Sequence, residues 1–138
     1  MKKSARVNAM TNVSDVKRQI MVVDDDDDIR LLLSSFLRAE GYSVIEAATA
    51  DEAEAYALKH APQLILMDLS LGGSDGLSAI WNIRRQPGMA TVPIVIVSAH
   101  DAYDLRAEAA AAGCREYLTK PLDVIDLKKT IQSILEDD

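Results

Sequence analysis

The sequence predicts an α/β fold, a doubly wound parallel sheet of five strands with helices on both faces. The chain of 138 residues alternates short apolar runs with segments of helical pattern, and this alternation repeats five times. The apolar runs are continuous, which is typical of strands buried on both faces of a parallel sheet. We expect strands at 20–23, 43–47, 64–67, 94–97 and 116–118, and helices at 29–37, 51–60, 77–85, 105–112 and 127–135.

The first two units show the pattern clearly. The first strand, Ile20-Met21-Val22-Val23, stops abruptly at five consecutive aspartates. Gly41 is a typical stop signal for the helix that follows, and Thr49 or Asp51 is a typical N-cap for the second helix. The apolar residues of the first helix recur at helical spacing: Ile29, Leu32, Leu33, Phe36 and Leu37.

The remaining three units follow the same alternation. The third strand ends at Asp68, and glycines at positions 72, 73 and 76 predict a loop before the third helix. Pro93 opens the fourth strand, which ends at Ser98, and an alanine-rich helix then closes at Gly113. The fifth strand is short and leads into Lys120-Pro121. One face of the last helix is apolar: Leu127, Ile131, Ile134 and Leu135.

Composition excludes several classes of protein. Apolar residues make up 49% of the chain and charged residues 27%, which is ordinary for a folded domain. The single cysteine, Cys114, cannot form an internal disulfide, and no Cys/His cluster suggests zinc. No apolar run approaches the roughly 20 residues that span a bilayer. We therefore expect a cytoplasmic protein with no membrane segment.

Charge divides the chain into two parts. Residues 1–18 carry five basic side chains against Asp15 alone, whereas the whole chain has a net charge of −7. The body is therefore strongly acidic, which argues against direct binding of nucleic acid. We expect a flexible basic extension over 1–18 and one folded domain over 19–138.

Polar side chains stand where four of the apolar runs end, and they suggest one site. In open parallel sheets, ligands bind beyond the carboxyl ends of the strands. Carboxylates that converge there repel one another, and a divalent cation relieves this repulsion; an all-oxygen ligand set suits magnesium. An aspartate beside magnesium and a lysine is the arrangement for covalent aspartyl phosphate chemistry. The strand-end residues are Asp24, Asp25, Asp68, Ser98 and Lys120.

Four motifs, in order and suitably spaced over about 19–136, resemble the receiver domains of two-component response regulators. They are VVDDDDDIR, LILMDLSLGGSDGL, PIVIVSA and AGCREYLTKPL. The resemblance implies a flavodoxin-like (βα)5 fold with strand order 2-1-3-4-5. It also implies a domain that accepts a phosphoryl group from a histidine kinase or phosphotransfer protein and signals to a downstream target or output domain. Such a domain is not an enzyme on outside substrates.

The resemblance assigns the acceptor pocket residue by residue. Asp68 is the expected phospho-acceptor. Asp25 is expected to ligate Mg²⁺ directly and Asp24 mainly through water, with Asp68 and the backbone carbonyl of Ser70 completing the metal site. The side chain of Ser70 is also expected to tune the phosphoryl lifetime, and His100 borders the pocket and is given a minor tuning role.

The same comparison assigns the switch. Ser98 is expected to hydrogen-bond the phosphoryl group and Lys120 to pair with it, ahead of a cis Pro121. Tyr117 is the expected aromatic switch. The fourth helix, fifth strand and fifth helix, roughly 101–135, form the expected switching surface, which is also a candidate surface for a homodimer. Two positions depart from the family pattern, since Asp27 and Gly72 stand where proline is common.

Two alternative functions remain open at the level of sequence. A magnesium-dependent phosphohydrolase of the haloacid-dehalogenase type needs an acid two residues after its nucleophile and then a hydroxyl residue. Asp24 and Asp26 satisfy that spacing, but Asp28 occupies the place of the hydroxyl, and no cap domain is visible. The other alternative is a receiver that acts as an unphosphorylated scaffold, against which the complete set of site residues argues. A calcium-binding loop over the aspartate run fails, because Ile29 and Ser35 stand where glycine and glutamate are required.

Overall fold

The computed structural model describes residues 17–72, 74–100 and 103–136, so that most of the predicted extension over 1–18 lies outside the described residues. The elements follow the predicted alternation of strands and helices. The main-sheet strands are β1 (Gln19–Val23), β2 (Ser43–Ala47), β3 (Leu64–Met67), β6 (Ile94–Ser98) and β7 (Glu116–Thr119). The helices are α1 (Asp27–Ala39), α2 (Ala50–His60), α3 (Gly76–Arg84), α4 (Tyr103–Ala111) and α5 (Val124–Glu136).

The five long strands form one parallel sheet in the order β2-β1-β3-β6-β7. This confirms the predicted doubly wound order, since β6 and β7 are the fourth and fifth strands of that sheet along the chain. The glycine-containing segment after β3 is more ordered than the loop that the sequence predicts. It holds a short antiparallel pair, β4 (Ser70–Leu71) and β5 (Ser74–Asp75). Two-residue strands are too short to produce a periodic pattern, which explains why the sequence does not reveal them.

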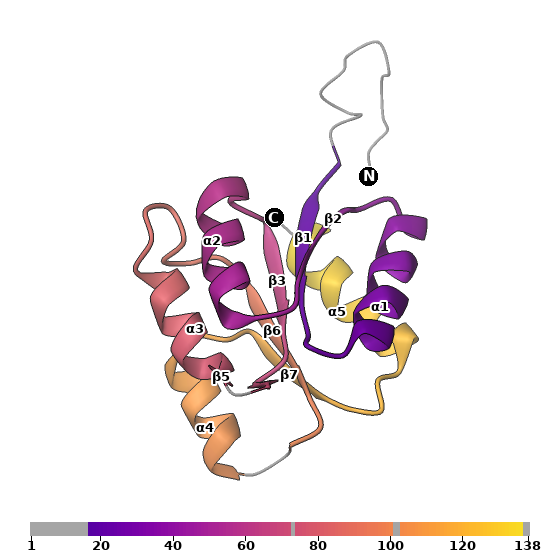
Figure 1. Cartoon of the computed structure of the whole chain (residues 1–138). Helices are drawn as coiled ribbons and strands as arrows, with labels where there is room; N and C mark the ends of the chain where they lie inside the picture. Colours follow the sequence, from indigo (N-terminus) through magenta and orange to yellow (C-terminus); the bar gives the residue numbers. More distant parts are fainter. Residues whose placement is uncertain (1–16, 73, 101–102, 137–138) are drawn as a thin grey trace.

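Alternate residues of each strand pack on opposite faces of the sheet. Helices α1 and α5 cover one face, and α2, α3 and α4 cover the other (Figure 1). In β1, for example, Ile20 and Val22 belong to the α1–α5 core, whereas Met21 and Val23 belong to the core on the opposite face. The central strands β1, β3 and β6 are therefore buried on both sides, as continuous apolar runs predict.

The aspartate run serves partly to start a helix. Asp26 is the N-cap of α1, and its side chain accepts hydrogen bonds from the backbone N–H of Asp28 (2.9 Å) and Ile29 (3.1 Å). Thr49, one of the two caps expected for α2, accepts from the N–H of Glu52 at 3.0 Å. Both caps follow the carboxyl ends of β1 and β2, so the two helices begin at the edge of the sheet where polar residues gather.

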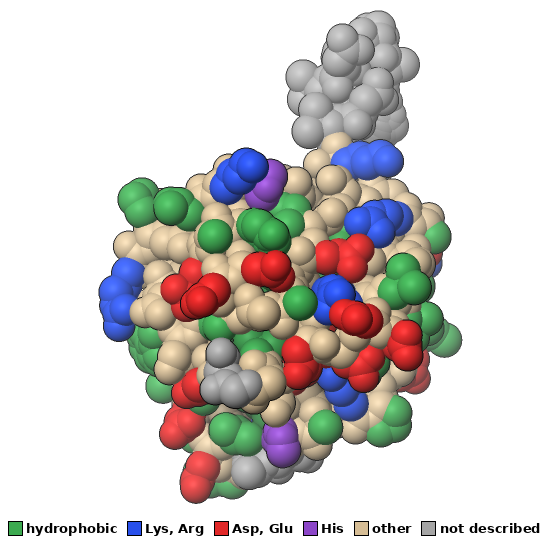
Figure 2. Space-filling view, in the orientation of Figure 1, with side chains coloured by type: hydrophobic (Ala, Val, Ile, Leu, Met, Phe, Trp, Pro, Cys, Tyr) green, Lys and Arg blue, Asp and Glu red, His purple; other side chains and the backbone are tan. Residues whose placement is uncertain are grey.

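The described surface has two features that matter for function. Acidic side chains gather over the β1–α1 loop and the start of α1, with fewer basic ones among them (Figure 2). Leu32 is 62% exposed, although its spacing groups it with Leu33 and Leu37, which are buried. Across the described residues, no helix combines the length and the apolar character needed to cross a membrane.

Candidate functional site at the carboxyl ends of the strands

Three aspartates converge where β1 and β3 end. Asp24, Asp25 and Asp68 each offer one carboxylate oxygen, and these oxygens lie within 4.8 Å of one another. Asp24 and Asp68 are only 1% and 6% exposed, whereas Asp25 faces solvent. Their proximity follows from the register, because Val23 at the end of β1 pairs with Met67 at the end of β3. The pocket therefore joins two buried carboxylates to one that water can reach.

Lys120 supplies the positive charge of this pocket. Its Nζ lies 2.8 Å from Oδ2 of Asp24 and 3.3 Å from Oδ2 of Asp68. Burial alone would lower the pKa of Lys120, but its bond to Asp24 and the negative charges of both aspartates outweigh burial, so its pKa is raised. One ammonium group thus faces three carboxylates, which leaves the pocket with an excess of negative charge.

The backbone around Asp68 holds its carboxylate in place. The N–H of Ser70 donates to Oδ1 of Asp68 at 3.0 Å, and the N–H of Asp68 donates to the carbonyl of Val23 at 3.0 Å. Burial raises the pKa of Asp68, although the Ser70 N–H and the charge of Lys120 act in the opposite direction. The ionised form of Asp68 is therefore less stable, relative to the protonated form, than that of a carboxyl group in water.

Gly76 is a positioning residue that the sequence placed only in a loop. A Cβ at this position would lie 2.6 Å from the carbonyl oxygen of Asp68 and 2.7 Å from Cα of Leu69, so no other residue fits without moving the backbone of Asp68. The available signal was a glycine at the start of an apolar helix, where it costs about 1 kcal/mol and so suggests a packing reason. Gly72 adopts a φ of +64°, a left-handed conformation that proline, with φ fixed near −65°, cannot adopt.

Arg30 fixes the buried aspartate from the α1 side. It donates to the backbone carbonyl of Asp24 at 2.7 Å and pairs with Asp27 at 2.6 Å and Glu46 at 3.3 Å. Oδ1 of Asp24 also accepts from the N–H of Asp26 at 2.9 Å. Asp27, which stands where proline is common in the family that the sequence resembles, thus provides a partner for Arg30. The sequence did not reveal this role of Arg30, because Glu46 is 16 positions away on β2.

Ser98 and Tyr117 are connected through the backbone of His100. Ser98 is fully buried, its Oγ accepts from the N–H of His100 at 3.1 Å, and its carbonyl accepts from the N–H of Lys120 at 2.8 Å. The hydroxyl of Tyr117 donates to the carbonyl of His100 at 2.6 Å. The peptide between Lys120 and Pro121 is cis. Ser98 and Tyr117 therefore share the backbone of His100 as a hydrogen-bonding partner.

Three other side chains that could carry chemistry or binding lie in different environments. Burial raises the pKa of the Cys114 thiol to about 11, which makes it a poor nucleophile at neutral pH. Trp81 is 44% exposed on α3, so its ring is only partly packed against the rest of the protein. The side chain of His100 is exposed, and its contribution to the site described above is made by the backbone.

Known proteins share both this sequence pattern and this fold. The family model for the response regulator receiver domain matches residues 20–132 of this sequence. Protein PilH of Pseudomonas aeruginosa is 30% identical over 117 residues, which cover 85% of this chain and 97% of PilH. The chemotaxis protein CheY4 of Vibrio cholerae superposes with a TM-score of 0.83 at 29% identity, covering 87% of this chain and all of that one.

A further solved structure bears on the metal. The receiver domain of the sensor histidine kinase PA1611 from Pseudomonas aeruginosa PAO1 contains a magnesium ion coordinated in its active-site cleft. It has a TM-score of 0.79 at 30% identity and covers 86% of this chain and 98% of its own. Together with the family match, which spans most of the chain, these comparisons establish the class. The chain belongs to the receiver-domain family of two-component response regulators.

Proposed function

We propose that this receiver domain accepts a phosphoryl group on Asp68 with the help of Mg²⁺ and alters its interaction surface in response. The observation that carries the proposal is the constellation around one buried carboxylate. Asp68 lies within 4.8 Å of two other carboxylates and 3.3 Å from the ammonium group of Lys120. Unpaired carboxylates are unfavourable in a buried position, so this arrangement suits a site that receives a cation and an anion together.

The residues present fit a magnesium ion. The candidate ligands are carboxylate oxygens of Asp25, Asp24 and Asp68, with the carbonyl of Ser70 added by family resemblance, and Mg²⁺ prefers oxygen ligands. The exposure of Asp25 leaves room for the water ligands that Mg²⁺ retains. When bound, the ion would offset the charge that develops on the transferring phosphoryl group.

The proposed chemistry is transfer from a phosphohistidine. An oxygen of Asp68 attacks phosphorus in line, the O–P bond forms as the P–N bond to the donor breaks, and the histidine leaves. Lys120 then pairs with the new phosphoryl group instead of with the Asp68 carboxylate, and Ser98 donates its hydroxyl to a phosphoryl oxygen. The domain thus assists its own phosphorylation and dephosphorylation and is not an enzyme on outside substrates.

The proposed output is a change in the α4–β7–α5 face. We propose that the Oγ of Ser98 turns from the N–H of His100 toward the phosphoryl group and that this turn frees space for Tyr117 to move inward. We propose this face as the contact for a downstream protein or output domain and as a homodimer surface. The domain makes no direct contact with nucleic acid in this scheme, and it works in the cytoplasm, where the donor kinase presents its phosphohistidine.

An apolar cleft beside the pocket offers a docking site for the donor. Leu32 and Leu33 of α1 face Pro121, Leu122 and Val124 across this cleft, and Lys120 reaches it from the pocket side. Exposed apolar side chains around a cleft are typical of protein contacts. A histidine kinase or phosphotransfer protein that docks here would hold its phosphohistidine close to Asp68.

The acceptor assignment is tested with acetyl phosphate, which needs no protein partner. Incubation with acetyl phosphate and Mg²⁺ should add one phosphoryl group, detected as an intact-mass increase, and Asp68→Asn should abolish it. Asp104→Asn, which removes an exposed carboxylate on α4, should leave the uptake unchanged. Equal uptake by Asp68→Asn would overturn the assignment. Steady hydrolysis of phosphate esters would favour the phosphohydrolase alternative, and absence of uptake by the wild type would favour the scaffold.

A further inference from the structure

The ring of Tyr117 is held from two sides. Its hydroxyl donates to the carbonyl of His100 at 2.6 Å, and the guanidinium carbon of Arg106 lies 4.5 Å from the centroid of its ring. Tyr117 is half-buried on β7, whereas Arg106 is exposed on α4. A guanidinium at this distance over an aromatic face is attracted to the negative face of the ring. The cation–π contact therefore joins the edge strand to α4.

This contact lies at one end of a chain of interactions that begins in the acceptor pocket. The Oγ of Ser98 accepts a hydrogen bond from the N–H of His100, and the carbonyl of His100 accepts one from the hydroxyl of Tyr117. If Ser98 turns toward a phosphoryl group, His100 loses one of its two backbone hydrogen bonds to these side chains. We expect the backbone at His100, and with it the bond of the Tyr117 hydroxyl, to loosen, whereas the contact of the ring with Arg106 does not depend on His100.

Arg84 fixes the carboxyl-terminal end of α4 to the rest of the fold. Arg84 donates to the carbonyls of Ala112 (3.1 Å) and Gly113 (3.2 Å), just beyond the helix, and to that of Val92 (2.6 Å) before β6. A cation at the C-terminal end of a helix satisfies carbonyls that have no partner within the helix. We therefore expect the amino-terminal half of α4, which carries Arg106, to be the part that responds to the pocket.

We propose that Arg106 is a positioning residue that holds Tyr117 in its unphosphorylated position and so sets how readily the domain switches. The proposal rests on the proposed function above, since it concerns the response to a phosphoryl group on Asp68. Turning the ring inward separates it from the guanidinium, so the contact favours the unphosphorylated state. A cation–π contact at an exposed site changes an equilibrium by about two- to five-fold.

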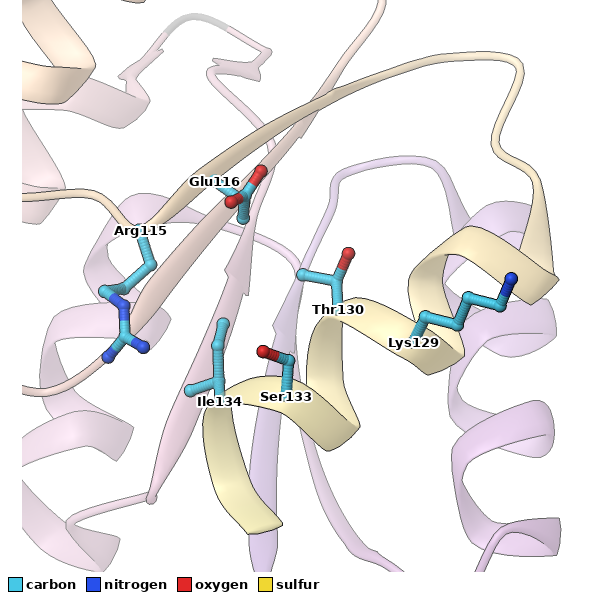
Figure 3. Close-up of a pocket in the computed structure, with 6 residues that line it drawn as sticks. All are labelled: Arg115, Glu116, Lys129, Thr130, Ser133 and Ile134. Carbon is cyan, nitrogen blue, oxygen red and sulfur yellow. The ribbon is translucent and has the colours of Figure 1, made fainter. Parts of the chain in front are cut away.

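The test measures binding of beryllofluoride, a phosphoryl mimic, at saturating Mg²⁺ by titration calorimetry. Arg106→Gln removes the charge while keeping much of the side chain, and it should tighten the apparent affinity by about two- to five-fold. The matched control is Lys129→Gln, the same change in charge on α5, which packs on the opposite face of the sheet. Lys129 is one of the residues that line a pocket between β7 and α5, and its amine extends away from Arg115 and Glu116 of that pocket (Figure 3). This control should leave the affinity unchanged.

Double variants separate the aromatic ring from its hydroxyl. In a Tyr117→Phe background the ring remains, so Arg106→Gln should still tighten binding. In a Tyr117→Leu background the ring is gone, and the effect of Arg106→Gln should disappear. A general structural role for Arg106 would give the same effect in all three backgrounds. An unchanged or weaker affinity of the single variant, or an equal effect of Lys129→Gln, would overturn the proposal.

Failure of the proposed function would give a different result. If the wild type neither binds beryllofluoride nor takes up phosphate, the proposed function is wrong. The contact is then tested by the same double-variant comparison applied to the unfolding equilibrium in urea. Coupling of about two- to five-fold between Arg106 and the Tyr117 ring should remain in the unphosphorylated protein. Absence of that coupling would reject the role of Arg106 independently of phosphorylation.

Discussion

The two flanks of the acceptor pocket differ in chemistry. On the α1–α5 flank, large apolar side chains face solvent: Leu32 (62% exposed) and Val124 (39%) line the cleft, and Leu31 (59%) and Ile125 (62%) precede or follow them in α1 and α5. The α4–β7 flank instead exposes Arg106, Glu108 and Glu116, together with Tyr103. Lys120 connects the two, because its side chain lines the apolar cleft and its backbone N–H bonds to Ser98 on the other side.

The difference suggests a division of labour. An apolar flank offers the same contact surface whether or not Asp68 is phosphorylated, which suits a docking site for the phosphoryl donor. The other flank is held by an aromatic ring, a guanidinium group and a few hydrogen bonds, and individually weak contacts of this kind suit the switch proposed above. The predictions below test whether the two flanks act independently.

The largest effect is expected on the apolar flank. Leu32→Asp places a charge beside the cleft and should slow phosphotransfer from an autophosphorylated histidine kinase core, chosen because it phosphorylates the wild type, by at least about tenfold. Uptake from acetyl phosphate should be unchanged, because this donor needs no docking surface. Leu58 on α2 is equally exposed at 62%, so Leu58→Asp is the matched control and should behave as the wild type.

Two other outcomes would contradict this assignment. If Leu32→Asp also slows uptake from acetyl phosphate, the substitution disturbs the pocket itself and the flanks are not independent. If it slows neither reaction, the donor docks elsewhere. Arg106→Gln should tighten the binding of beryllofluoride, as argued above, and should change the rate of phosphotransfer from the kinase little.

The sequence predicts the central sheet well because burial on both faces leaves a strong signal. Continuous apolar runs identify β1, β3 and β6, and the polar residue that ends each run identifies the edge at which Asp24, Asp68 and Ser98 meet. A parallel sheet brings these ends together whatever the lengths of the helices between them. The family motifs add the roles of individual residues, which remain predictions for the experiments proposed here.

Other features depend on contacts between residues distant in sequence. Helical spacing groups Leu32 with Leu33, but the apolar stripe of α1 is wider than the surface that the sheet covers, so Leu32 faces solvent. The ion pair of Arg30 with Glu46 and the contact of Arg106 with Tyr117 depend on the packing of neighbouring elements. The close approach of Gly76 to the backbone of Asp68 depends on how α3 leaves the loop. None of these has a local periodic signal.

A second prediction concerns the three carboxylates that lie between the flanks, those of Asp24, Asp25 and Asp68. Asp25→Ala removes one of three converging carboxylates, so magnesium affinity should fall by about tenfold, roughly the loss expected for one strong ligand. In EDTA the same variant should melt about 1–3 °C higher than the wild type, because repulsion with Asp24 and Asp68 is relieved. Glu116→Ala, which removes an exposed carboxylate at the start of β7, should change neither quantity.

Calorimetric titration and thermal unfolding measure the two effects separately. Magnesium should also raise the melting temperature of the wild type by mass action, and by less in Asp25→Ala. A variant that is destabilised in EDTA and still binds magnesium normally would show that the three carboxylates do not form one cation site.

The smallest effect is expected at Ser70, which belongs to neither flank and tests whether the pocket is also open to water from β4. Hydrolysis of the aspartyl phosphate needs a water molecule in line with phosphorus, and the Ser70 side chain is exposed, small and polar. Ser70→Met should obstruct this approach and slow dephosphorylation several-fold, about 1 kcal/mol on the barrier. Magnesium affinity should change little, because the expected metal contact is the backbone carbonyl, and the Ser70 N–H that bonds to Asp68 is retained.

The measurement is the decay of phosphorylated protein after the phosphodonor is removed, at saturating magnesium. Ser70→Ala, which adds no bulk, separates obstruction from loss of the hydroxyl and should decay much faster than Ser70→Met. Unchanged or faster decay of Ser70→Met would mean that water reaches phosphorus by another route, between the two flanks rather than past β4.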